Sequence, residues 1–339
     1  MPRQQVGSYR EMIIRTYTVN QLPIIDIAPL YSDDQAAWQA IAQHIDQACR
    51  EWGFFYIKGH PISAERIEQV VGAAQQFFAL PQAEKLKIDI TQTRHHRGYG
   101  AIATEQLDPN LPSDLKETFD MGFHLPADHP DVVAEKPLRG PNRHPEMPGW
   151  QALMEQHYLD MQALAQKLLQ AITVALGIER DFFDTRFVAP VSVLRFIHYP
   201  PRHTATSAEQ QGAGAHTDYG CITLLHQDSA GGLQVRDVRG QWIDAPPIEG
   251  TFVVNIGDMM ARWSNDRYVS TPHRVISPLG VDRYSMPFFV EPNPDTRIEC
   301  LPGCQSESHP ARYPATTCAD FLLSRFADTY AYRREPQSS

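Results

Sequence analysis

The second half of the chain carries short, closely spaced β-type segments, and this pattern restricts the fold more than any other feature. After Val188 the segments alternate with turns that contain Gly, Pro and Asp. The segments are VSVLRFIHY, CITLLHQD, GGLQVRD, TFVVNIGD, HRVIS and SMPFFVEP. Many short strands separated by turn residues are typical of a β-sandwich or a jelly roll. The chain is therefore predicted to be mainly β with flanking α-helices, and its core is expected over about 188–295.

The first half of the chain predicts helices around this β core. Apolar residues recur at helical spacing over 34–52, from Ser63 onward and over 150–176. Two strand-like segments, LPIIDIAPL and GFFYIKGH, precede and follow the first of these helices. A last helix is expected to begin near Thr316 or Thr317.

The chain length and these patterns suggest two regions. Residues 1–148 are expected to form an N-terminal α/β region packed on the core, and residues 149–339 to hold the long helix, the β core and the C-terminal helix. Within the first region, residues 89–148 are rich in Pro, Gly and His and are predicted to form long loops with short strands. Loops of this length usually serve a function or cover something. We expect the two regions to form one integrated unit.

The charge balance argues against two classes of partner. The chain has 30 Lys and Arg against 40 Asp and Glu, a formal net charge of −10. Proteins that bind nucleic acids or anionic lipids usually present basic surfaces, so neither partner is expected. No apolar run approaches the ~20 residues of a membrane span, and we expect no signal peptide. The five scattered cysteines, an odd number, favour the cytoplasm over a disulfide framework.

The motif HTD in GAHTDYG, together with a distant histidine, predicts a metal site. His216 and Asp218 are two residues apart, so on a strand their side chains point to the same face. His273 follows Asp218 by 55 residues, which is enough chain for several strands to bring it back beside them. Two histidines and one carboxylate on one face of a metal leave the other face open, as in non-haem Fe(II) sites that take O₂ and a co-substrate. A structural zinc site would instead be closed.

A second group of residues predicts a receptor for a carboxylate. Arg283 and Ser285 share one face of a strand by the same two-residue spacing. A guanidinium beside a hydroxyl binds carboxylates well, and Tyr199 in RFIHYPP could add a phenol donor. The simplest ligand that joins this receptor to the metal is a dicarboxylic keto acid.

The order and spacing of these motifs resemble the isopenicillin-N-synthase-like (iron/ascorbate oxidoreductase) family of Fe(II)/2-oxoglutarate-dependent dioxygenases. The similarity covers most of the chain, and each fragment alone would be weak. In the N-terminal region it is carried by LPIIDIAPL, GFFYIKGH, RGYG and LKETFDMG. In the core it is carried by HTDYGCITLLHQD, GGLQV, NIGDMMARWSND, STPHRV, RYS and PFF.

The resemblance implies a double-stranded β-helix core and an oxidation that consumes 2-oxoglutarate and O₂. The implied iron ligands are His216, Asp218 and His273. The implied residues for the distal carboxylate of 2-oxoglutarate are Arg283, Ser285 and Tyr199. The co-substrate would give succinate and CO₂ while a small-molecule substrate is hydroxylated or otherwise oxidised at a C–H bond, with ascorbate as a stimulant. Many relatives carry Asn where this chain has Ile197, so one contact to the co-substrate is expected to differ.

Three other functions are compatible with parts of this pattern. An oxidase of the same fold would use O₂ without 2-oxoglutarate. A zinc hydrolase would need a general base near the metal, and none is evident beside HTD. A non-catalytic jelly-roll module would need neither the open metal face nor the carboxylate receptor. We expect a small-molecule substrate of unknown identity and a monomeric protein.

Several further residues near the motifs have expected roles. Arg195 shares a strand face with Tyr199 and would either line the pocket or balance buried charge. His96 and Arg97 are expected in a solvated loop, with the mouth of the pocket as the alternative, and Asn255 is expected in a turn. Phe289 is expected to pack in the core, with the border of the substrate pocket as the alternative.

Overall fold

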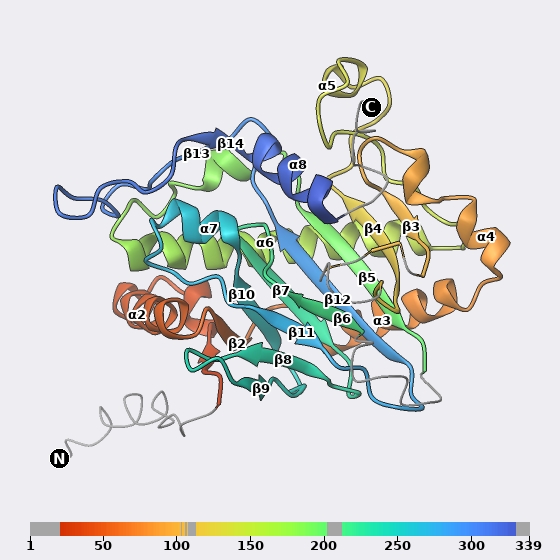
Figure 1. Cartoon of the computed structure of the whole chain (residues 1–339), viewed down its shortest axis with the longest axis horizontal. Coiled ribbons are helices and arrows are strands. Elements are labelled where there is room, and N and C mark those ends of the chain that lie inside the picture. The colour runs from red at the N-terminus through yellow and green to blue at the C-terminus, as the bar shows by residue number, and fades with distance from the viewer. Residues whose placement is uncertain (1–20, 103, 106, 108–112, 202–211, 330–339) are drawn as a thin grey trace, which may run out of the picture.

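Two β-sheets packed against one another form the centre of the molecule in this computed structural model (Figure 1). The structure describes residues 21–102, 104–105, 107, 113–201 and 212–329. The larger sheet has the strand order β1-β2-β10-β7-β12-β5-β4-β3. Its strands are β1 (Ile24–Asp26), β2 (Phe54–Lys58), β3 (Gly98–Gly100), β4 (Glu117–Gly122), β5 (Val193–Tyr199), β7 (Ile222–Gln227), β10 (Phe252–Ile256) and β12 (Arg283–Val290).

The smaller sheet has the order β6-β11-β8-β9 and lies over one face of the larger one. Its strands are β6 (Ala213–His216), β8 (Leu233–Arg236), β9 (Trp242–Asp244) and β11 (His273–Val275). Apolar side chains from both sheets meet between them, including Phe54 and Tyr56 from the larger sheet and Val235 and Val275 from the smaller. This arrangement agrees with the predicted jelly-roll core. A separate pair, β13 (Arg297–Ile298) and β14 (Thr316–Thr317), lies outside both sheets.

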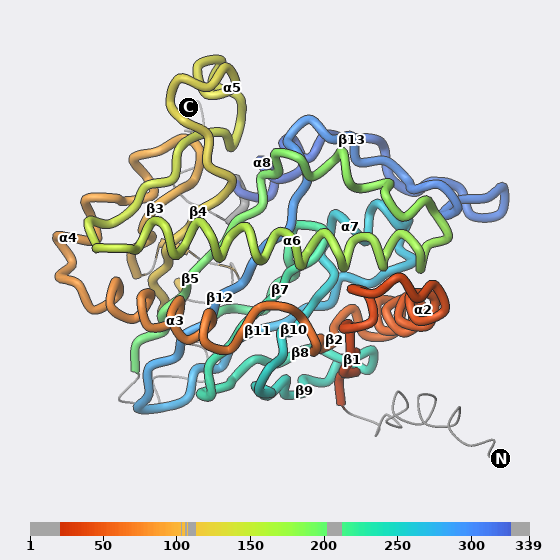
Figure 2. The backbone as a smooth tube through the Cα atoms, turned by 180° about the vertical axis from the view of Figure 1, so that it is seen from behind, coloured from red at the N-terminus to blue at the C-terminus, as the bar shows by residue number. Residues whose placement is uncertain are grey.

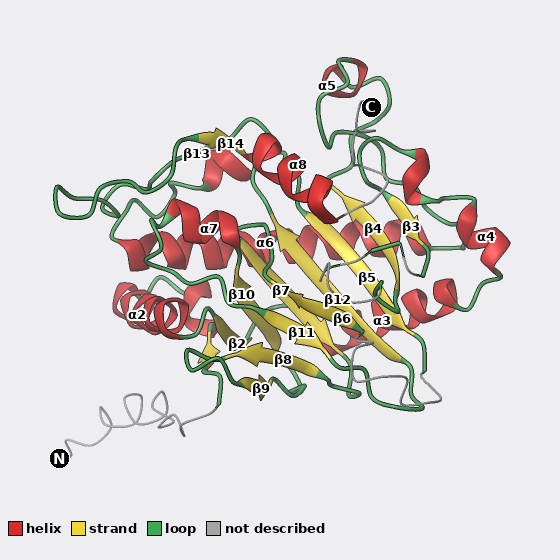
Figure 3. Cartoon of the chain, viewed as in Figure 1, coloured by secondary structure: helices red, strands yellow, loops and turns green. Residues whose placement is uncertain are grey.

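Helices cover the other face of the larger sheet, as the view from behind shows (Figure 2). The long helix α6 crosses this face and packs against α2 and α3. The α-helices are α2 (Gln35–Glu51), α3 (Ala64–Phe78), α4 (Gln82–Leu86), α5 (Pro130–Val133), α6 (Trp150–Leu176), α7 (Asp258–Trp263) and α8 (Cys318–Thr329). The 3-10 helices are η1 (Ala28–Tyr31), η2 (Ile90–Gln92) and η3 (Asp184–Phe187). Figure 3 shows α7 and α8 above the same end of the two sheets.

The helix ends follow local signals in the sequence. The predicted helix over 150–176 is confirmed, and it ends at Gly177, which has the left-handed φ of 73° that glycine tolerates. Ser63 caps α3 because its hydroxyl accepts the backbone N–H of Arg66 at 3.2 Å. Thr317 caps α8 in the same way, accepting the N–H of Asp320 at 3.1 Å. The last helix therefore begins directly after the predicted threonines.

The N-terminal region contributes strands to both sides of the larger sheet. β2 pairs with β1 and β10, while β4 pairs with β3 and β5. All six residues of β4 are buried. The Pro-, Gly- and His-rich region 89–148 thus contains two strands of the sheet that carries the core, together with loops and the short helix α5.

A largely buried polar cluster joins β4, β5 and Asp282, the exposed residue directly before β12. His198 contacts Glu117 through Nδ1 at 2.7 Å and Asp282 through Nε2 at 2.6 Å. Glu117 also accepts hydrogen bonds from Lys85 Nζ and the hydroxyl of Tyr99, both at 2.6 Å. Burial alone would lower the pKa of His198, but its hydrogen bonds to the two carboxylates outweigh burial and raise that pKa.

His198→Gln is expected to destabilise the fold more at about pH 6 than at about pH 9. Because the folded-state pKa of His198 is raised, its charged form stabilises the protein fully below its unfolded pKa of about 6.5. That contribution is lost as the pH rises through the raised folded-state pKa. Urea unfolding of wild type and variant at both pH values measures it, and an equal loss of free energy at both would contradict the assignment.

Candidate metal centre and co-substrate pocket

A cavity lies between the two sheets and holds all six residues predicted for the site. It encloses about 1030 Å³ of space, its open mouth included. Strands β5, β7, β10 and β12 form one wall, and β6, β8 and β11 form the opposite wall. The predicted residues that line it are His216, Asp218, His273, Arg283, Ser285 and Tyr199.

Three side chains from different segments converge at one end of this cavity. His216 at the end of β6 pairs directly with His273 on β11, and their ring centroids lie 4.4 Å apart. The Oδ1 atom of Asp218 lies 3.8 Å from Nε2 of His216 and 3.6 Å from Nε2 of His273. One potential ligand atom from each residue therefore lies within 4.8 Å of the others. This is the only such group of His, Cys, Asp or Glu found among the residues that the structure describes.

Hydrogen bonds fix which atoms of the three side chains face one another. Nδ1 of His216 donates to the Gly214 carbonyl at 2.7 Å, and Nδ1 of His273 lies 3.3 Å from the Thr271 carbonyl. Both histidines thus direct Nε2 into the cavity. Such contacts to the outer atoms of metal-binding side chains set the tautomer and the ring orientation.

The carboxylate of Asp218 is oriented in the same way. Its Oδ2 atom accepts hydrogen bonds from Thr223 Oγ1 at 2.6 Å and Asn255 Nδ2 at 2.7 Å, which leaves Oδ1 for the two imidazoles. Burial raises the pKa of Asp218, but the imidazoles and these hydrogen bonds hold it below its usual value. Burial, with His273 adding to it, lowers the pKa of His216 to about 3. Neutral imidazole and charged carboxylate are the forms that bind a divalent metal.

The predicted carboxylate receptor is also assembled. Arg283 is 1% exposed, and its Nε donates to the Gly231 carbonyl at 2.6 Å while Nη1 donates to Ser285 Oγ at 3.2 Å. The guanidinium lies 4.7 Å from the ring centroid of Tyr199. Among the described residues no carboxylate forms an ion pair with Arg283. A buried cation without an anionic partner is costly, so this end of the cavity is suited to an anionic group of a ligand.

Strand alternation explains how one strand serves several parts of the cavity. Every second residue of β12 faces inward, and the inward series runs Arg283, Ser285, Pro287, Phe289 and then Glu291. On the paired strand β5 the inward series is Val193, Arg195, Ile197 and Tyr199. The receptor therefore lies at one end of these two strands. Phe289, which lines the cavity, follows the alternative prediction rather than simple core packing.

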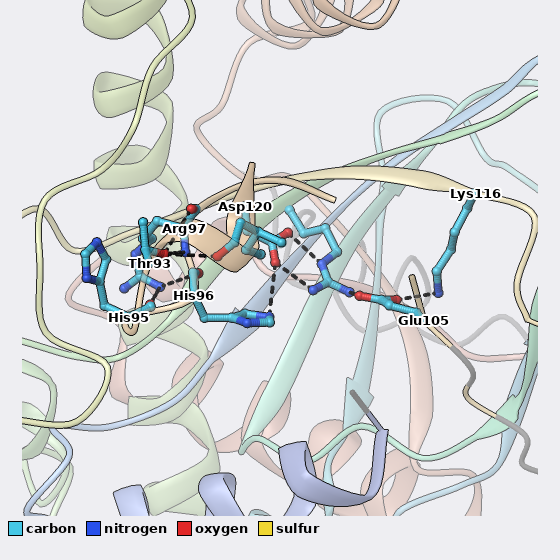
Figure 4. A network of polar contacts seen from close by, with 9 residues as sticks. Thr93, His95, His96, Arg97, Glu105, Lys116 and Asp120 are labelled. Carbon is cyan, nitrogen blue, oxygen red and sulfur yellow. Dashed lines mark hydrogen bonds and ion pairs between the residues drawn. The ribbon is translucent and has the colours of Figure 1, made fainter. Parts of the chain in front are cut away.

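A chain of buried charged side chains lies along one wall of the cavity, and Figure 4 shows most of its members. Lys116 Nζ lies 3.0 Å from Glu105 Oε2, and Glu105 Oε1 lies 2.8 Å from Nη1 of Arg195. The other side of that guanidinium donates two hydrogen bonds to Asp120, at 2.7 and 2.6 Å. His96 Nε2 lies 3.6 Å from Asp120. Arg195 thus does both things proposed for it, since it lines the cavity and balances buried charge.

The prediction that His96 and Arg97 lie in a solvated loop is wrong. His96 is 3% exposed, and its ring stacks on Phe326 of α8 at 5.3 Å. Arg97 is 2% exposed and donates to the carbonyls of His95 and His96. Its guanidinium lies against Gly122, where a Cβ would come within 2.1 Å of Nη2. Contacts with distant segments, rather than local polarity, bury both residues.

Sequence reasoning missed three polar residues of the cavity. Asn255 was expected in a turn, but it lies on β10 and its amide orients Asp218, together with Thr223. Glu291 follows β12 and lines the cavity. Burial, with the charge of Asp218 adding to it, raises the pKa of Glu291 to about 8. Counting the two-residue alternation of β12 onward from Ser285 would have found Glu291.

Comparisons with known proteins agree with this geometry. A family model described as non-haem dioxygenase in morphine synthesis N-terminal matches residues 22–147, and the 2OG-Fe(II) oxygenase superfamily model matches residues 190–292. The chain is 39% identical to hxnY, a 2-oxoglutarate-Fe(II) type oxidoreductase of Emericella nidulans, over 92% of this chain and 93% of that protein. The chain belongs to the 2OG-Fe(II) oxygenase superfamily.

Two further relatives support the fold and the reaction class of this oxygenase. A homoarginine-6-hydroxylase of Oryza sativa subsp. japonica is 38% identical over 90% of this chain and 96% of its own. The crystal structure of a full-length Neurospora crassa protein in complex with alpha-KG has a TM-score of 0.81 and 35% identity, covering 91% of this chain and 96% of that one. The predicted family, jelly-roll fold, 2-oxoglutarate-dependent oxidation and Fe(II) cofactor are thereby confirmed. Within the described residues, no helix of the oxygenase is both long and apolar enough to span a bilayer.

The donor set of the cavity fits the family's metal and co-substrate. Two imidazoles and one carboxylate are the set that non-haem Fe(II) prefers, and the outer atoms of these side chains are already hydrogen-bonded. The Arg283 guanidinium, which forms no ion pair with the described residues, suits an acidic group of a ligand.

Proposed function

We propose that His216, Asp218 and His273 hold Fe(II) in this oxygenase. The support is the convergence of the three ligand atoms and the hydrogen bonds that orient them. When bound, Fe(II) with 2-oxoglutarate supplies the oxidising chemistry, in which O₂ is consumed, succinate and CO₂ are released and a C–H bond of the substrate is oxidised. The protein's part is to orient the ligands, bind both organic molecules and keep the cavity dry.

We propose further that Arg283, Ser285 and Tyr199 bind the distal carboxylate of 2-oxoglutarate. The single observation that carries this assignment is the buried Arg283 guanidinium, which has no acidic partner in the described part of the chain. Ile197, paired with Ser285 across β5 and β12, offers no polar atom there. The family contact expected from an asparagine is therefore absent, and Arg283 and Ser285 bear more of the binding.

Formation of succinate tests this function against an oxidase that uses no 2-oxoglutarate. Purified protein with Fe(II), ascorbate, O₂ and 2-oxoglutarate should form succinate slowly alone and faster when mixtures of small metabolites contain a substrate. The coupled reaction should give one succinate for each oxidised product. O₂ uptake with an oxidised product but without succinate would support the oxidase instead.

Asn255→Ala and Thr223→Val are each expected to weaken Fe(II) binding by about 10–100-fold, the usual effect of losing a contact that orients a ligand. Each variant removes one hydrogen bond to Asp218 Oδ2 and leaves the three ligands in place. Anaerobic titration with Fe(II) measures the dissociation constants. Thr223→Ser retains the hydroxyl and serves as the matched control. Unchanged affinity in both variants would contradict the orienting role.

We propose a small-molecule substrate for the remainder of the cavity, as the relatives suggest. The same Neurospora crassa protein, at 35% identity, has a second crystal structure in complex with alpha-KG and thymine, and another relative is a homoarginine-6-hydroxylase. Neither name identifies the substrate of this chain. The support here is the cavity between the sheets, which extends beyond the proposed iron ligands.

We also propose that residues 1–148 and 149–339 act as one catalytic unit, as a monomer in the cytoplasm. Strands from both regions share one sheet, which supports a single catalytic unit. All five cysteines are free, which supports a reducing compartment. Sedimentation analysis and cell fractionation would test the assembly and the location.

A further inference from the structure

Beyond the proposed ligands of iron and 2-oxoglutarate, one part of the cavity has no assigned role. We call it the distal chamber and define it by Val193, Arg195, Phe289, Glu291 and Phe326, all of which line the cavity. On β12, Phe289 lies four residues beyond Ser285, which corresponds to about 13 Å of strand. Phe289 also pairs with Thr223, the residue that orients Asp218. The chamber is therefore beside the proposed iron ligands and away from the carboxylate receptor.

The two cations that line this wall of the cavity, Arg195 in the chamber and Lys116 nearer Tyr199, already have anionic partners. Arg195 contacts Asp120 through two nitrogens, at 2.7 and 2.6 Å, and Glu105 through a third at 2.8 Å. Lys116 lies 3.0 Å from Glu105 and 3.1 Å from Asp114. Unlike Arg283, Arg195 and Lys116 are already paired with carboxylates, so neither is available for an ion pair with an acidic substrate. A substrate carboxylate in this chamber would lose its water without gaining a free cation from the described residues that line the cavity, which is unfavourable.

Glu291 is a polar residue of the chamber whose carboxyl group has no hydrogen-bond or ion-pair partner among the described residues. Glu291 is 6% exposed, and its Oε2 atom has no hydrogen-bond partner among the described residues. No described cation lies within ion-pair distance of its carboxyl group. Its backbone is fixed, because its N–H donates to Ser192 Oγ at 3.0 Å and its carbonyl accepts from the same hydroxyl at 2.9 Å.

The local packing leaves space for the Glu291 side chain. A Cβ at Gly220 would lie only 3.1 Å from both Cγ and Oε1 of Glu291, so glycine at this position makes room for it. A buried polar group that the protein itself leaves unpaired costs free energy, and a bound donor would remove that cost. The other chamber walls are mainly apolar and aromatic, from Val193, Phe289 and Phe326.

We propose that Glu291 receives an N–H group of the substrate, and that the substrate is a compact, non-acidic ring compound carrying that N–H, such as a lactam or an aromatic amide. This assignment rests on the proposed function, because it places the substrate beside the proposed iron ligands. The apolar walls contact the ring, and the Glu291 carboxyl group accepts a hydrogen bond from the N–H on the polar edge of the ring. Glu291 is then a specificity-determining residue, since loss of the N–H would leave its carboxyl group unpaired again.

Matched probes test the substrate class by binding. Protein loaded with Fe(II) and 2-oxoglutarate without O₂ is titrated with 2-pyridone and N-methyl-2-pyridone, with benzamide and N,N-dimethylbenzamide, and with benzoate. We expect each N–H compound to bind at least about tenfold more tightly than its methylated partner, as loss of one hydrogen bond predicts, and benzoate to bind weakest. Failure of both N–H compounds to bind, or tightest binding by benzoate, would overturn the proposed class.

Variants test the residue itself. Glu291→Leu is expected to lose the preference for N–H compounds, whereas Glu291→Gln, which keeps an acceptor and nearly the same shape, should retain most of it. Glu299→Gln removes an exposed carboxylate and is the control for charge. A preference that persists in Glu291→Leu would overturn the role of Glu291. Binding of 2-oxoglutarate to the Fe(II)-loaded wild type is measured first, because its absence would count against the proposed function rather than against the substrate class.

Discussion

Asp218→Ala is expected to abolish Fe(II) binding and to reduce turnover by roughly 10³-fold or more. Losses of this size are usual when one member of a set of cooperating active-site residues is removed. The variant removes the carboxylate that lies 3.8 and 3.6 Å from the two imidazoles. It also leaves the donors of Thr223 and Asn255 without their buried acceptor. Anaerobic titration with Fe(II) and succinate formation measure the two effects.

A control must separate loss of metal from loss of fold. Asp181→Ala replaces an exposed aspartate outside the cavity and should bind Fe(II) as the wild type does. Circular dichroism and the melting temperature of Asp218→Ala report whether the sheets remain folded. If folded Asp218→Ala bound Fe(II) with unchanged affinity, the proposed metal site would be wrong.

Arg283→Ala is expected to raise the KM for 2-oxoglutarate by about 30-fold to several thousandfold. Removing one partner of a buried, hydrogen-bonded charge pair costs about 2–5 kcal/mol, and every 1.4 kcal/mol is about a factor of ten. The affinity for Fe(II) should change little, because Arg283 contacts Gly231, Ser285 and the Tyr199 ring rather than the three proposed ligands. Steady-state kinetics with varied 2-oxoglutarate provides the measurement.

Arg283→Lys keeps the charge but loses the planar fork and serves as the comparison. Its KM should lie between those of the wild type and Arg283→Ala. A KM in Arg283→Ala equal to that of the wild type would show that another group binds the distal carboxylate.

The site residues predicted from the sequence were those whose geometry depends on short spacing within a strand. Arg283 and Ser285 follow the two-residue period of β12, so a strand assignment was enough to place them on one face. The same spacing pointed to His216 and Asp218, although β6 ends at His216 and Asp218 lies just beyond it. The long helix was predictable because its apolar period continues to Gly177, which ends it. The prediction for His273 required a later strand to return beside the HTD motif. The pairing of β11 with β6 does this, because it places His273 directly opposite His216.

The residues that sequence reasoning missed depend on contacts between distant segments. Asn255 contacts Asp218 because β10 lies next to β7, a pairing that nothing in the local sequence of Asn255 specifies. Asp120 meets Arg195 because β4 pairs with β5 across 75 residues of chain. His96 is buried by Phe326, which lies near the other end of the protein. The polar local sequence predicts that such residues are exposed. They are buried because strands and helices from distant parts of the chain pack against them.

The single inward face of β12 has a consequence for how this oxygenase could acquire new substrates. Substitutions at Phe289 or Glu291 would reshape the chamber and leave Arg283 and Ser285, the residues proposed to bind 2-oxoglutarate, unchanged. Inserting one residue between Ser285 and Phe289 would instead turn the later side chains toward the helices and bring core residues such as Phe288 into the opening. Relatives that take other substrates should therefore differ in the side chains of this strand and not in its length. Insertion or deletion of a single residue in the strand should be selected against.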